Sequence, residues 1–97
     1  MWINKIELGG RLARKFELKT SGTGKNFINF TIHSSKEKKQ QYTPCVAFGD
    51  LALVINDLQP ECFLTIEGEI STSSVDNKIT GKKDYKTSVI THRITTG

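Results

Sequence analysis

Residues 42–58 read YTPCVAFGDLALVINDL and join two different patterns of apolar residues. The first half, 42–48, alternates as a strand does. Its larger side chains share one face: Tyr42, Pro44, Val46 and Phe48. Its smaller side chains share the other: Thr43, Cys45 and Ala47. The small face suits a narrow interior, and the large face would present two aromatic rings about 20 Å apart along an extended strand.

The second half of this stretch predicts a short helix. Gly49 ends the alternation, and Asp50 can cap the helix that follows. Apolar residues then recur at helical spacing, which predicts one buried stripe: Leu51, Val54, Ile55 and Leu58. Pro60 ends the helix. A strand with outward aromatic rings, closed by a plug helix, predicts the floor and wall of a ligand groove.

The composition is that of one globular domain over residues 1–97. The chain is 36% hydrophobic and 25% charged, and it contains no apolar run long enough to cross a membrane. Residues 1–5 lack the apolar segment of a signal peptide. These features predict a cytoplasmic location without a membrane partner. We expect Cys45 and Cys62 to be reduced packing residues, because reducing compartments disfavour disulfides.

The chain carries no pattern that indicates an enzyme. It has no Cys-x-x-Cys pair and no cluster of cysteines and histidines that would predict a metal site. It has no nucleophile placed beside a base and no paired carboxylates. We therefore expect a binding protein with no catalytic residues, no metal and no cofactor.

Charge is distributed unevenly along the chain. Residues 40–77 contain no lysine or arginine and six acidic side chains, a formal charge of −6. The rest of the chain, with 14 basic and 4 acidic side chains, carries +10. A polarised basic surface favours polyanions as partners.

Five segments read as strands, at 3–19, 26–33, 42–48, 62–70 and 85–94. Gly9 and Gly10 interrupt the first strand, and Gly68 interrupts the fourth, where each predicts a bulge or a sharp coil. The segments 34–41 and 71–84 are polar and read as loops. An all-β chain with one short helix between strands three and four predicts the five-stranded, Greek-key oligonucleotide/oligosaccharide-binding barrel, or OB fold.

The ligand face of that fold lies on its second and third strands, where aromatic side chains alternate with the core. Phe27 lies on the polar face of the second strand, so base stacking and burial at a subunit contact are both open. The candidate stacking residues are Tyr42, Phe48, Phe27, Tyr85 and Trp2. For Trp2, packing between subunits or over the barrel is equally open. The candidate phosphate contacts are the cations around this face: Lys5, Arg11, Arg14, Lys15, Lys25, Lys36, Lys38, Lys39, Lys78, Lys82, Lys83 and Lys86.

From residue 4 to residue 94 the chain resembles a bacterial-type single-stranded-DNA-binding protein. The resemblance rests on Asn-Lys-Ile-x-Leu-x-Gly-x-Leu at 4–12 and on Asn-Phe-Thr-Ile at 29–32. An aromatic residue, five further residues and Phe48-Gly49 form its most specific part. Leu51-Ala52, Ile66-Glu67-Gly68 and Tyr85-Lys86-Thr87 complete it. Tyr42 takes the place of a stacking tryptophan of the family, and Phe48 matches a stacking phenylalanine. The loop tryptophans and the acidic tail of the family have no counterpart here, which predicts a compact variant from a mobile element or phage, or a truncated chain.

The resemblance implies binding of single-stranded DNA with little sequence specificity, in replication or recombination. It also implies a homo-oligomer, a dimer or a tetramer, and replication proteins such as a helicase, primase or polymerase as partners. RNA remains open as the nucleic acid. Two alternatives remain open as well: a primosome-type accessory protein that acts mainly by docking a helicase or primase, and a protein-interaction barrel whose aromatic rings are buried between subunits.

Overall fold

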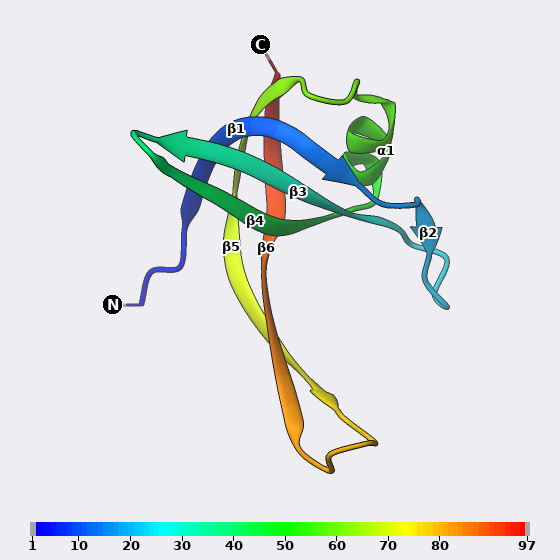
Figure 1. The fold of residues 1–97 in the computed structure, drawn as a ribbon. Helices are drawn as coiled ribbons and strands as arrows, with labels where there is room; N and C mark the ends of the chain where they lie inside the picture. Colours follow the sequence, from blue (N-terminus) through cyan, green and yellow to red (C-terminus); the bar gives the residue numbers. More distant parts are fainter. Residues whose placement is uncertain (1, 97) are drawn as a thin grey trace.

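The computed structural model describes residues 2–96 as a small barrel with three projecting hairpins (Figure 1). The elements, in chain order, are β1 (Ile6–Lys15), β2 (Lys19–Thr20), β3 (Asn26–Lys36), β4 (Lys39–Phe48), α1 (Asp50–Asp57), β5 (Phe63–Asp76) and β6 (Lys83–Thr96). The predicted architecture is confirmed, because β1, β3, β4, β5 and β6 form the barrel and α1 lies between its third and fourth strands.

The barrel closes because β1 pairs with two different strands. Its first part pairs with β5, and its second part pairs with β3 from Arg11 onward. The sheet therefore runs β1-β5-β6-β4-β3 and returns to β1, with β4 and β6 parallel and the other pairs antiparallel. Where β1 changes its partner from β5 to β3, a Cβ on Gly10 would lie 2.3 Å from the carbonyl oxygen of His33. Only glycine allows the two backbones to approach this closely.

The sharp coil expected at Gly9 and Gly10 is thus present, but the bulge lies further on, between Leu12 and Arg14. The bulge predicted at Gly68 is confirmed by a register shift between Glu67 and Gly68 against β6. The first strand is shorter than predicted. It ends at Lys15, and a two-residue strand, β2, follows after a break at residues 16–18, where the Phe16 amide still donates a hydrogen bond to the carbonyl oxygen of Asn29.

The core is built from the inward faces that alternation predicted, except that Val46, expected on the outer face of its strand, is buried where it lies opposite Ile90 of β6. Ile28, Phe30 and Ile32 of β3 are fully buried, as are Cys45 and Ala47 of β4. The other buried apolar side chains are Leu12, Val46, Ala52, Ile55, Leu64, Ile66 and Val89. Both cysteines are free, which is what we expected. Burial raises the pKa of the Cys45 thiol to about 12, and a hydrogen bond with the backbone of Ile32 opposes this in part.

The helix differs in detail from its prediction. Gly49, not Asp50, holds the N-cap position, at a φ of 62° and with no side-chain hydrogen bond to the helix. Ala52 and Ile55 are the buried helical residues, whereas Val54 is exposed. The predicted stripe was wrong at Val54 because α1 packs against β3, β4 and β6 along a narrow strip. Ala52 and Ile55 face that strip, whereas Val54 does not.

The two segments that read as polar loops are mostly strand. β3 and β4 continue to a turn at Glu37 and Lys38, and β5 and β6 continue to a tip at residues 77–82. These ribbons extend beyond the barrel, where neither face meets a core (Figure 1). Their sequences are mostly polar and show no apolar alternation, so their backbone ladders alone make them strands.

Candidate nucleic-acid interface

The outer face of the β3–β4 hairpin carries aromatic rings at both ends. The register pairs Phe27 with Phe48 near the helix and His33 with Tyr42 toward the turn. The side chains opposite each other between these pairs are smaller: Asn29 with Val46, and Thr31 with Pro44. We call this surface the aromatic face. It is about 20 Å long, since six residues separate the rings on each strand.

At the helix end, Phe27 and Phe48 pack against each other. Their ring centroids lie 6.3 Å apart with the planes tilted by 37°. The ammonium of Lys25 lies 5.5 Å from the centroid of the Phe48 ring, within the range of a cation–π interaction. Phe48 is 37% exposed, and Phe27 is half-buried beneath it. A positive charge beside an exposed ring suits a base and its phosphate together.

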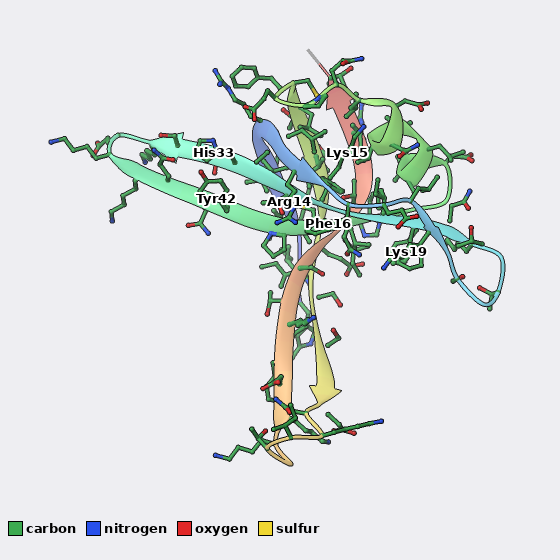
Figure 2. The ribbon with its side chains drawn as sticks, turned by 45° about the vertical axis from the view of Figure 1, so that its right-hand side comes forward. Arg14, Lys15, Phe16, Lys19, His33 and Tyr42 are labelled. Atoms are coloured by element: carbon green, nitrogen blue, oxygen red, sulfur yellow. The ribbon has the colours of Figure 1, made fainter. Side chains whose placement is uncertain are left out.

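At the other end, His33 stacks on Tyr42. The ring centroids are 4.7 Å apart and the planes are nearly parallel, at 20°. The Nε2 atom of His33 lies 3.1 Å from Oε1 of Gln40, a hydrogen bond that holds the imidazole in place. Tyr42 is 58% exposed, so the side of its ring away from His33 is open. Figure 2 labels both rings on the facing strands β3 and β4.

Sequence reasoning missed His33, which is not among the candidate stacking residues. The signal was present, however. A two-residue turn at Glu37 and Lys38 places position 33 opposite position 42, and position 27 opposite position 48. Reading 34–41 as an open loop left that register undetermined. The turn therefore places His33 opposite Tyr42, where the two rings stack.

Arginines from β1 border the aromatic face. Arg14 lies opposite Thr31 across the β1–β3 pair, and its guanidinium carbon is 4.6 Å from the centroid of the Phe16 ring. Figure 2 labels Arg14 and Phe16 near the centre of the barrel. Arg11 lies opposite His33, with its guanidinium carbon 4.9 Å from the centroid of the Phe63 ring. Each guanidinium lies over a ring within cation–π distance, and its N–H groups can still donate to a phosphate.

Lys15 has a different environment from its neighbours. Its ammonium donates hydrogen bonds to the carbonyl oxygens of Asn56, at 2.6 Å, and Leu58, at 2.8 Å. These carbonyls lie at the C-terminal end of α1, where the helix dipole is negative and no basic residue of the helix itself is present. Lys15 therefore binds the helix end in this structure rather than the aromatic face.

The remaining candidates are spread over the molecule. Lys36, Lys38 and Lys39 surround the turn of the β3–β4 hairpin, beyond Tyr42. Five others lie on or beside the β5–β6 hairpin, which projects in another direction (Figure 1): Lys78, Lys82, Lys83, Tyr85 and Lys86. Lys5 lines a cavity of about 360 Å³ with Glu67, Glu69 and His92. Trp2 precedes β1 and is fully exposed.

Within residues 2–96, no group of three or more histidine, cysteine or acidic side chains is placed to hold a metal ion. Over the same residues, no helix is both long and apolar enough to cross a membrane.

Comparison with known proteins matches the chain to a family. Residues 3–96 match the model of the single-strand binding protein family. The chain is 29% identical over 98 residues to single-stranded DNA-binding protein 1 of Chlorobaculum tepidum, covering 91% of this chain and 60% of the relative. It is also 29% identical over 96 residues to the single-stranded DNA-binding protein of Borreliella burgdorferi, covering 90% of this chain and 64% of the relative. The chain thus spans less than two thirds of the length of these curated relatives.

A solved structure shows the same fold. The crystal structure of the mitochondrial single-stranded DNA binding protein from S. cerevisiae matches with a TM-score of 0.78 and 15% sequence identity. The match covers 99% of this chain and 96% of that chain. At this identity the likeness concerns the fold alone, and it confirms the predicted OB barrel.

Proposed function

The chain belongs to the single-strand binding protein family, and from that premise we propose that it binds single-stranded DNA with little sequence preference. The family consists of binding proteins, so the chain is not an enzyme. The observation that carries the proposal is the aromatic face, with a ring pair at each end and cations at its border. The names of the curated relatives support single-stranded DNA as the ligand.

Binding would combine two kinds of contact. Bases stack on the exposed rings of Tyr42 and Phe48, and each stacked base contributes about 1–3 kcal/mol. Phosphates meet the cations beside those rings: Arg14, Lys25, Lys36, Lys38 and Lys39. Stacking requires only the flat face of a base, which every base has, so sequence preference is weak. Duplex DNA hides these faces and binds poorly.

A substitution at Phe48 tests the stacking half of this proposal. Phe48→Ala removes the exposed ring at the helix end, and we expect it to weaken the binding of poly-dT about tenfold or more. The measurement is a fluorescence or anisotropy titration with poly-dT and with a duplex control. Leu53→Ala is the matched control, since Leu53 is an exposed apolar residue on α1. A folded Phe48→Ala protein with unchanged affinity would remove Phe48 from the site.

Tyr85, Trp2 and the lysines of the β5–β6 hairpin stay predictions as nucleic-acid contacts. They are exposed on parts of the molecule away from the aromatic face, so a strand that reached them would have to bend around the barrel. A homo-oligomer, replication enzymes as partners and a mobile-element origin also stay predictions.

A further inference from the structure

Four side chains line up across four adjacent strands, and two of them were not among the candidates from the sequence. Tyr42 on β4 lies opposite His33 on β3, and His33 lies opposite Arg11 on β1. Arg11 in turn lies opposite Phe63, the first residue of β5. We call these four residues the stacking row. It runs across the strands and spans three interstrand steps, about 14 Å.

Flat groups are paired at both ends of the stacking row. The rings of His33 and Tyr42 stack at 4.7 Å, and the guanidinium of Arg11 lies over Phe63 at 4.9 Å. Tyr42 and Phe63 are 58% and 57% exposed. The side chains of Arg11 and Phe63 point outward, because the next residues on β1 and β5, Leu12 and Leu64, are buried in the core. Aromatic rings and arginine planes are both surfaces on which unpaired bases stack.

A groove lies between the two halves of the stacking row. Its volume is about 600 Å³, within the range of ligand sites in proteins. It is lined by Gly9 and Gly10 of β1, by residues of β3 and by the start of β5. The other lining residues are Arg11, His33, Ser34, Ser35, Phe63, Leu64 and Thr65. A Cβ on Gly9 would lie 3.2 Å from the hydroxyl of Thr65, so glycine keeps the groove open there.

The charge of the groove suits a nucleotide. Among the described lining residues, Arg11 alone has a permanent charge, and it is positive. Glu61 lies outside the lining, with a carboxylate oxygen 4.0 Å from Nη1 of Arg11. That exposed ion pair contributes little, so a phosphate can replace Glu61 beside the guanidinium. Serine hydroxyls on the opposite wall can donate to the same phosphate or to base edges.

We propose that the stacking row is a second part of the nucleic-acid path. A single strand leaves the aromatic face at Tyr42, crosses β3 and β1, and places a base in the groove between His33 and Phe63, with Arg11 at the adjoining phosphate. This inference rests on the proposed function, because its ligand is a continuation of the same strand. His33 is the link, since it belongs both to the ring pair with Tyr42 and to the wall of the groove.

Oligonucleotide length separates this inference from the proposed function. Single OB folds occupy about 4 to about 16 nucleotides, so oligothymidines of those two lengths are the probes. We expect Phe63→Leu to weaken binding of the longer oligothymidine about tenfold. Binding of the shorter one should be unchanged, because the aromatic face alone can hold the shorter strand. Phe48→Ala should weaken both. Equal unfolding midpoints would show that the variants are folded.

Two matched substitutions complete the experiment. His33→Ala should weaken binding of the longer oligothymidine. His92→Ala is the matched control and should not, because this second histidine of the chain is hydrogen-bonded to Glu69 and does not line the groove. If Phe48→Ala weakens binding but Phe63→Leu and His33→Ala do not, the inference is overturned and the proposed function stands. If the wild-type protein binds neither oligothymidine, both fail.

Sedimentation distinguishes the remaining alternative. If wild-type protein sediments as an oligomer, and Phe63→Leu reduces it to a smaller species with the same affinity per barrel for the longer oligothymidine, the groove is a contact between copies of this chain and the inference is overturned. Unchanged sedimentation with weakened binding supports the groove as part of the nucleic-acid path.

Discussion

Cys45 shows how one buried side chain follows from its position on a strand. It lies on the small face of β4, is 1% exposed, and its thiol lies 3.4 Å from the carbonyl oxygen of Thr43. Burial disfavours the thiolate and raises the pKa of Cys45 to about 12. Cys62, just before β5, is half-buried and also free. The chain thus offers two thiols with different access to reagents.

We predict that native protein at about pH 8 reacts with iodoacetamide at Cys62 and not at Cys45, because alkylation requires an accessible thiolate. Mass spectrometry would count one modified cysteine in the native protein and two in denaturant. Cys62→Ser is the control, and it should leave the native protein unmodified. Rapid native modification of that variant would mean that β4 opens far more often than a closed barrel allows.

At the scale of the element, α1 depends on a residue from another part of the chain. Its last turn contains no basic residue, and its terminal carbonyls would otherwise face solvent. Lys15 supplies an ammonium from the end of β1, at 2.6 Å and 2.8 Å from two of those oxygens. One lysine therefore couples the closing strand of the barrel to the helix.

We predict that Lys15→Met lowers the free energy of unfolding by about 1–2 kcal/mol, because it removes two charge-assisted hydrogen bonds at the helix C-terminus. Chemical denaturation would measure this loss. Arg14→Met is the control, because Arg14 directly precedes Lys15 and its side chain lies over Phe16. It should change the free energy of unfolding by less than about 0.5 kcal/mol. Equal stability of the two variants would contradict the helix-capping role of Lys15.

At the scale of the molecule, charge divides along the fold. The acidic segment 40–77 contains α1 and β5, and the cations gather on β1, beside β3 and at the hairpin ends. A strand on the aromatic face would therefore meet cations from β1 and from both ends of the β3–β4 hairpin. Such binding releases counterions from the phosphates and weakens as salt rises.

We predict that the affinity for poly-dT falls with salt by about 0.7 logarithmic units per tenfold change for each phosphate neutralised. Arg14→Met should reduce that slope by about 0.7, and Lys15→Met should leave it unchanged, because only Arg14 faces the strand. Titrations at several salt concentrations would give both slopes. A wild-type affinity independent of salt would remove the electrostatic part of the proposed function.

The sequence by itself determined what depends on near neighbours along the chain. Alternation at 26–33 and 42–48 identifies the inward and outward faces of β3 and β4. Helical spacing after Gly49 locates α1, and the motifs between residues 4 and 94 identify the family. These features are readable because the period of a strand or a helix repeats every few residues.

Only the tertiary structure decided which outward side chains meet. The stacking row joins Arg11 to Phe63, and Lys15 reaches the end of α1, across separations that no local period spans. Strand register and barrel closure set these pairings, and a shift of one residue would turn each side chain to the other face. Tyr42 and Phe48 could therefore be predicted as exposed rings from sequence. The pairing of His33 with Tyr42 depends on the turn of the β3–β4 hairpin, and the row from His33 through Arg11 to Phe63 forms only when the barrel closes.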